Sequence, residues 1–182
     1  MSPPPSAHRL RAYRFPAGAD FGGQLAGALE RLLLVGGGDL HDALFVIRDT
    51  GAGEPMAIDL RTASAGGTLV SMLDFRLDER RRRAVTNATL APGAGRVDRD
   101  AVEEIAAALE PGGALLAVVS AGHPVPALDD AVARTGGRLV ADEPTDAGRI
   151  AELEHGVLGR VARRRGPQGS ATSSEAPAGA AG

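Results

Sequence analysis

The residues of this sequence whose types and positions could do chemistry are led by His123. It follows an apolar run at residues 114–119 and precedes Pro124, at a point where a strand is expected to pass into a helix. Ligands tend to gather at the carboxyl ends of strands, so His123 is a candidate general base. With Arg14 or Arg48 it would form a candidate pocket for an acidic ligand. A surface histidine without a partner is the competing interpretation.

Two further patterns contain a histidine beside acidic residues. Asp42 could orient the imidazole of His41, but a catalytic role requires that His41 meet His123 in space. Glu152 and His155 have the spacing found in di-iron helical bundles, which need a second such motif that the chain lacks. A polar loop and a solvated helix face are the simpler interpretations, and we predict no metal site.

An arginine run at residues 80–83 could bind phosphates or an acidic protein surface. The chain contains its own acidic complement, because residues 98–110 include five acidic residues and one arginine. Pairing within the chain or across a dimer therefore competes with nucleic-acid binding. The net charge of -3 disfavours a general nucleic-acid binder.

Composition excludes several classes of enzyme. All 20 basic residues are arginine and there is no cysteine. The absence of lysine excludes a P-loop of the GxxxxGK[ST] type and Schiff-base chemistry with pyridoxal phosphate. The absence of cysteine excludes thiol nucleophiles, Cys-ligated zinc, iron–sulfur clusters and disulfides. We expect no cofactor.

The hydrophobic pattern that must position these residues predicts alternating strands and helices. Strands are expected at residues 9–15, 43–47, 56–60, 114–119 and 138–141, with Gly-rich or Pro-rich turns between the elements. Helices are expected after Asp20, from Asp100 with Glu103 as a capping box, after Pro126, and after Thr145 as a cap. This order predicts an α+β fold with a ferredoxin-like split βαβ arrangement, about five strands and helices mainly on one face. The pattern at residues 62–97 is not readable.

Composition also sets the expected domain boundaries. Residues 1–7 are rich in proline and residues 166–182 in Gly, Ala, Ser and Pro, so both ends are expected to be disordered around a single domain at residues 8–165. No stretch of eighteen apolar residues occurs, and the first residues do not resemble a signal peptide. We therefore expect no membrane span and a cytoplasmic protein.

Several segments together resemble a bacterial domain-of-unknown-function family, number twelve-sixty-nine, of small membrane- or stress-associated proteins. They are FVIRD at residues 45–49, the Gly66-Gly67 pair, Val97-Asp98 leading to ALEPGGA at 108–114, and residues 131–137. The resemblance implies ferredoxin-like halves, and it brings no activity and no catalytic residues. The long apolar middle segment of that family is shortened here to about ten residues followed by charged ones.

Three hypotheses of function follow. The first is a non-enzymatic homo-oligomeric or protein-interaction module that self-associates through a strand carrying Met56, Ile58 and Leu60. The second is a small-ligand-binding or catalytic ferredoxin-like dimer with a pocket near His123. The third is weak nucleic-acid binding through the arginines at residues 80–83 and 163–165.

Overall fold

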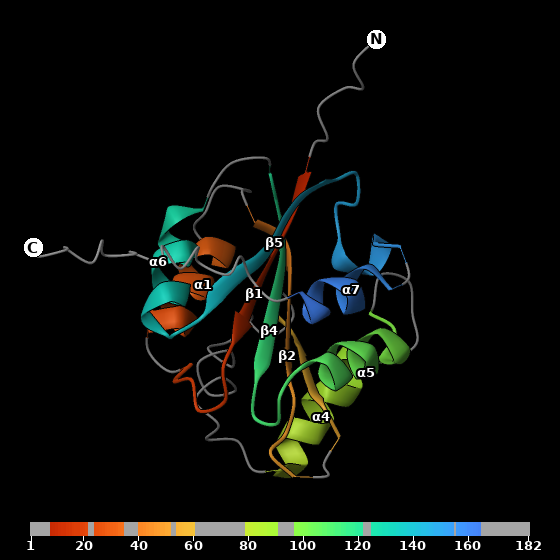
Figure 1. The fold of residues 1–182 in the computed structure, drawn as a ribbon. Helices are drawn as coiled ribbons and strands as arrows, with labels where there is room; N and C mark the ends of the chain where they lie inside the picture. The colour runs from red at the N-terminus through yellow and green to blue at the C-terminus, as the bar shows by residue number, and fades with distance from the viewer. Residues whose placement is uncertain are drawn as a thin grey trace, which may run out of the picture.

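A computed structural model describes residues 8–21, 24–34, 40–51, 54–60, 79–90, 97–121, 125–154 and 156–164. These residues form one antiparallel sheet of five strands with helices packed on it (Figure 1). The strands are β1 His8–Phe15, β2 Leu40–Ile47, β3 Met56–Asp59, β4 Ala114–Ala121 and β5 Arg138–Thr145. The helices are α1 Gln24–Leu34, α4 Glu79–Thr89, α5 Arg99–Ala108, α6 Pro126–Arg134, the 3-10 turn η1 Ile150–Glu152 and α7 Val157–Arg163.

The strand order β3-β2-β4-β1-β5 confirms the ferredoxin-like split βαβ arrangement. Strand β4 lies between β1 and β2 and pairs antiparallel with both, and β1 lies in the same way between β4 and β5. Each βαβ unit, β1-α1-β2 and β4-α6-β5, therefore encloses a strand of the other. Strand β3 extends the sheet by one strand beyond β2.

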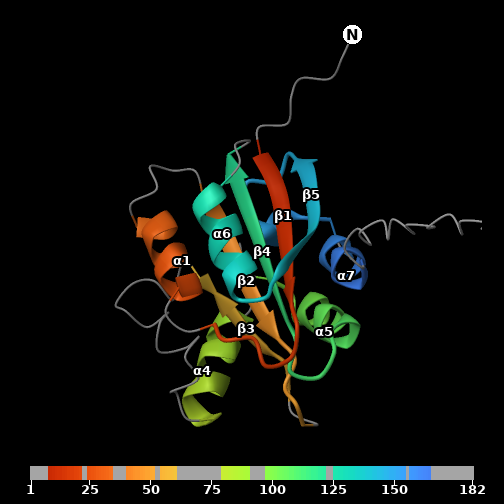
Figure 2. The same ribbon diagram turned by 60° about the vertical axis from the view of Figure 1, so that its left-hand side comes forward.

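Helices cover both faces of this sheet, not mainly one face as we predicted. Helices α1 and α6 pack on one face, and α5 and α7 lie on the other (Figures 1 and 2). Both faces must be covered because the inner strands β2 and β4 are apolar on both sides. In β4, for example, the neighbouring residues Leu115 and Leu116 point to opposite faces and are both buried. Leaving either face open would expose a row of aliphatic side chains to water.

Three phenylalanines form the centre of the layer under α1. Phe15 of β1 contacts the ring of Phe21 edge-on with centroids 5.2 Å apart and the ring of Phe45 at 5.9 Å. Phe21 and Phe45 also meet edge-on at 5.0 Å. Aromatic rings prefer offset or edge-to-face contact, and all three pairs of this cluster meet edge-on or tilted.

Two of the predicted helix starts are wrong. Helix α5 is capped by Asp98, whose carboxylate accepts the backbone N–H of Asp100, and not by a box formed from Asp100 and Glu103. The last predicted helix is divided into η1 and α7, and Thr145 belongs to β5. Gly156 at the start of α7 has φ of +80°, which interrupts a continuous helix.

No helix among the described residues is long and apolar enough to cross a bilayer. The terminal segments 1–7 and 165–182, and much of the segment 61–96, lie outside the described residues. The predictions of disordered ends therefore stay predictions.

Candidate interaction surface

The outer edge of β3 is covered by a helix. The backbone N–H groups of Ala57 and Asp59 point away from β2 and donate to the hydroxyls of Thr86 and Thr89 on α4, at 3.3 and 3.2 Å. Side chains from α4 thus supply acceptors that a neighbouring strand would otherwise provide. A second copy cannot add a strand at these two N–H groups while α4 is in place.

The self-association surface that we predicted on this strand is wrong for two of its three residues. The side chains of Ile58 and Leu60 are fully buried in the core of a single chain. Met56 is half-buried and packs against the same core. The alternation that suggested an exposed apolar face is instead the face of β3 that joins the core under α1.

The outer edge of β5 is also protected from pairing. Its pairing with β1 shifts register near Ala12, and Pro144 contributes no N–H group. Arg9 donates to the side chain of Asp142 at 2.6 Å and to its backbone carbonyl at 3.2 Å. A bulge, a proline and an occupied carbonyl are devices that discourage strand addition.

Arg14 and Arg48, the predicted partners of His123, lie at the end of the sheet where β4 begins. His123 itself lies outside the described residues, but Ala121 pairs with His8, whereas Arg14 pairs with Leu115. Six residues of strand separate the two positions, or about 20 Å. The pocket that would combine the two arginines with His123 stays a prediction.

Both arginines stabilise helix C-termini. Arg14 donates to the carbonyl of Ala108 at 3.2 Å and to that of Ala162 at 3.1 Å, and so joins the ends of α5 and α7. Arg48 donates to the carbonyl of Leu109 at 2.6 Å. A guanidinium at a helix C-terminus satisfies free carbonyls and complements the helix dipole.

Two histidines meet at the end of the sheet where β1 begins. The rings of His8 and His41 lie edge-on with centroids 4.7 Å apart. The carboxylate of Asp42 accepts the backbone N–H groups of Ala43 at 3.0 Å and Ile150 at 2.9 Å. Burial raises the pKa of the Asp42 carboxyl. Through its hydrogen bond to Ile150, Asp42 links η1 to β2.

No group of three or more metal-ligating side chains occurs among the described residues, which do not include His155. The pairing of Glu152 with His155 stays a prediction, and the carboxylate of Glu152 has backbone partners. It accepts the backbone N–H groups of Gly148 and Arg149 at 2.9 and 3.1 Å. It thus caps the 3-10 turn η1.

A charged network that we did not predict joins α6 to the sheet. Asp129 of α6 accepts the hydroxyl of Tyr13 at 2.7 Å and the guanidinium of Arg11 at 3.1 Å. Burial, and then the hydrogen bond to Asp129, raise the pKa of the Tyr13 hydroxyl, which stays protonated. The sequence signal was the alternation of Arg9, Arg11 and Tyr13, which places three polar side chains on one face of β1.

A hollow of about 490 Å³ lies between the loop after β1 and the end of α6. Most of its lining residues are exposed, Asp20 and Arg134 among them. The hydroxyl of Thr135 donates to carbonyls of α6. A ligand site usually adds buried polar groups that fix orientation, and this hollow offers none among its described residues.

A second hollow, a groove, lies on the other face of the sheet. It encloses about 200 Å³ between the first turn of α5, η1 and the start of α7. Its lining is mainly apolar or glycine, and acidic side chains stand at its rim. The apolar side chains are those of Val97, Ala101, Ile150, Ala151, Leu153 and Leu158, and the acidic ones are Asp98 and Glu154. We call this hollow the α5–α7 groove.

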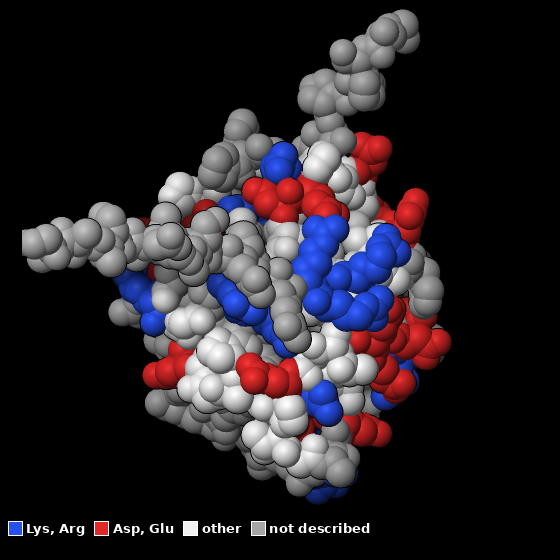
Figure 3. All heavy atoms as spheres, in the orientation of Figure 1, with Lys and Arg blue, Asp and Glu red and all other residues white. Residues whose placement is uncertain are grey.

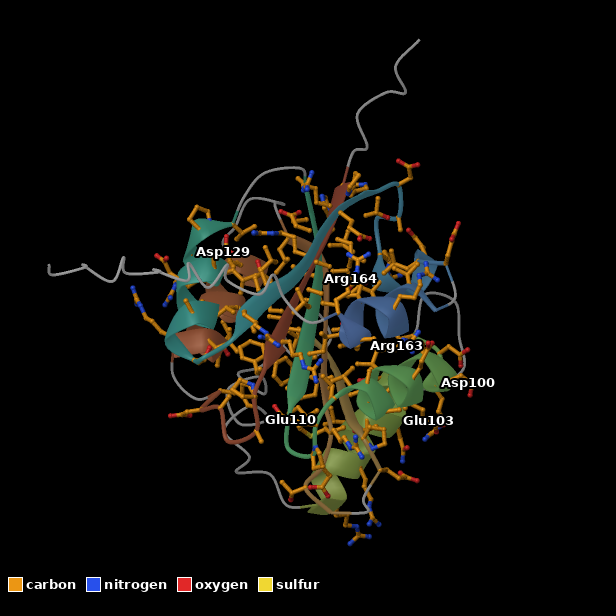
Figure 4. The ribbon with its side chains drawn as sticks, in the orientation of Figure 1. Asp100, Glu103, Glu110, Asp129, Arg163 and Arg164 are labelled. Atoms are coloured by element: carbon orange, nitrogen blue, oxygen red, sulfur yellow. The ribbon has the colours of Figure 1, made fainter. Side chains whose placement is uncertain are left out.

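Further acidic side chains lie along α5, among them Asp100 and Glu103, which Figure 4 labels. Acidic residues also gather on the same side of the molecule in Figure 3. Asp100 and Glu103 are exposed and make no ion pair with any residue that the structure describes. By contrast, Arg163 pairs with Glu104 at 2.9 Å, and Arg164 pairs with Glu143. The arginines at 163 and 164 are thus partly engaged inside the chain, which weakens the nucleic-acid hypothesis.

Comparisons with protein-family models, with curated proteins and with solved structures find no match to this chain. The resemblance to family twelve-sixty-nine therefore stays a prediction.

Proposed function

We propose that this chain is a non-enzymatic protein-interaction module that self-associates through the α5–α7 groove. The observation that carries the proposal is an apolar groove with an acidic rim, on a fold whose two sheet edges are protected from pairing. The groove holds about 200 Å³, which is below the range of about 300 to 1,000 Å³ typical of small-molecule sites. That volume suits one or two protruding side chains of a protein partner.

The polar groups that could have done chemistry support the non-enzymatic part of the proposal. Arg14 and Arg48 hold helix C-termini, Asp42 holds η1, and Tyr13 bonds to Asp129. Each is engaged in positioning backbone or a helix. A catalytic group must instead be directed at a site that a substrate can enter.

The test is a light-scattering measurement of solution mass over a series of concentrations, with a variant that fills the groove. Ala101→Phe places a ring in the groove from the half-exposed side of α5, and Ala133→Phe places the same ring on the exposed side of α6 as the control. We expect the mass of the wild type and of the control to rise toward two chains. Ala101→Phe should weaken association by about tenfold or more, the effect of losing about 1.4 kcal/mol.

Either of two results would overturn the proposal. One is a wild-type mass of a single chain at every concentration that remains soluble. The other is association of Ala101→Phe as strong as that of Ala133→Phe, with both variants folded by circular dichroism.

A further inference from the structure

The lining of the α5–α7 groove suits a side chain that is apolar along its length and positively charged at its end. The walls of the groove are mainly apolar or glycine, and Asp98 and Glu154 stand at its rim. Both acidic residues are exposed, and neither makes an ion pair with any residue that the structure describes. An arginine fits this lining, because its aliphatic stem can lie on the apolar walls while its guanidinium meets the carboxylates.

A second copy of the chain would have to supply this cation from an arginine, because the sequence contains no lysine. Two arginines at the end of α7 are already engaged, since Arg163 pairs with Glu104 and Arg164 with Glu143 of the same chain. Arg160 is exposed and, within the part of the chain that the structure describes, makes no ion pair. Arg160 is therefore available to a partner.

Arg160 also lies beside the groove. It belongs to α7, which packs against α5 (Figures 1 and 2). Its Nη1 atom lies 3.6 Å from the position that a Cβ of Gly156 would take, and Gly156 and Gly159 both line the groove. Arg99 is exposed as well, but it stands two positions before Ala101 and does not share the groove-lining side of α5. Each chain thus carries the groove and a matching arginine within one patch.

We propose that Arg160 of one copy inserts into the α5–α7 groove of a second copy, where its guanidinium pairs with Glu154 and Asp98. This inference rests on the proposed function and names the side chain that occupies the groove. A two-fold dimer uses the same patch on both copies, so the insertion occurs twice about the axis. The apolar walls supply burial, and the charged pair at the rim fixes how the two copies are aligned.

A charge exchange tests the pairing in the full chain. The first variant is Arg160→Glu and the second is Glu154→Arg. Each alone places like charges at both contacts, so we expect dimerisation about tenfold weaker or more. In an equimolar mixture one contact is reversed and the other is as in the wild type, so both attract and a heterodimer should form. Sedimentation at low and at high salt gives the readout, and salt should weaken the wild-type dimer.

The matched controls are Arg134→Glu and Asp130→Arg, which make the same charge changes at exposed positions of α6 and should dimerise as the wild type does. Dimerisation of Arg160→Glu as strong as that of Arg134→Glu, or a mixture that stays monomeric, would overturn the assignment of Arg160. If Ala101→Phe still disrupts the dimer in that case, the groove remains the contact and only its occupant is wrong. A wild type that is monomeric at every concentration would instead overturn the proposed function, and this inference with it.

Discussion

Replacing Gly137 by alanine should destabilise the fold because its α-carbon lies against the aromatic cluster. A Cβ at this position would lie 2.5 Å from Cε1 and 2.6 Å from Cδ1 of Phe15, and 2.8 Å from Cγ1 of Val132. Carbon atoms in contact are ordinarily about 3.5 to 4.0 Å apart, so the ring would have to move by about 1 Å. Phe15 is fully buried, and its ring contacts those of Phe21 and Phe45.

The magnitude follows from two opposing effects. Overpacking a closed core costs about 1 to 3 kcal/mol, and the lost flexibility of glycine in the unfolded chain returns about 0.4 to 1 kcal/mol. At the middle of both ranges, the net decrease in unfolding free energy is about 1.3 kcal/mol. For a domain of this size that corresponds to a Tm lower by about 3 to 5 °C.

Denaturant unfolding followed by circular dichroism measures this change, and Gly27→Ala is the matched control. Gly27 lies inside α1, where a new Cβ would meet only the end of the Arg31 side chain at 3.5 Å. Its replacement should stabilise the fold by about 0.5 to 1 kcal/mol through helix propensity. A Gly137→Ala protein as stable as the wild type would refute the packing of β5 and α6 against Phe15.

Two further outcomes are expected. Thr86→Val keeps the shape of the side chain but leaves the buried N–H of Ala57 without its acceptor. The unfolding free energy from chemical denaturation should therefore decrease by about 1 kcal/mol. An unchanged unfolding free energy would show that α4 does not cap β3. Asp42 has a pKa raised above 3.8 by burial and then by nearby Asp59, so its contribution to stability is fullest below that value and is lost as pH rises through the raised pKa. The stability of the wild type relative to Asp42→Asn should therefore fall as the pH rises above about 4, and a constant or rising difference would contradict the raised pKa.

Much of the fold was predictable from local patterns. Apolar runs at residues 43–47 and 114–119 identified the central strands, because only a strand covered on both faces is apolar at every position. Glycine and proline marked the ends of most elements, since glycine readily adopts backbone angles that strain other residues and proline fixes its own φ. The split βαβ order followed from the sequence of elements and the short connections.

The candidate site was decided by contacts between segments far apart in the chain. The pattern of Met56, Ile58 and Leu60 shows one apolar face, and period-two alternation cannot tell whether that face meets the core of its own chain or a second copy. Only the position of α4 over the strand edge excludes strand addition there.

The partners of the arginines were also decided by the tertiary structure. A guanidinium binds a helix carbonyl or an external carboxylate with similar hydrogen bonds, and the sequence alone gives its type but not its neighbour. Arg14 reaches Ala108 and Ala162 because β1 passes beneath the ends of α5 and α7, which is a property of the tertiary structure. The sequence by itself determined the residue types and the order of the elements, and the packing of the helices on both faces decided which of those residues remain exposed to bind a partner.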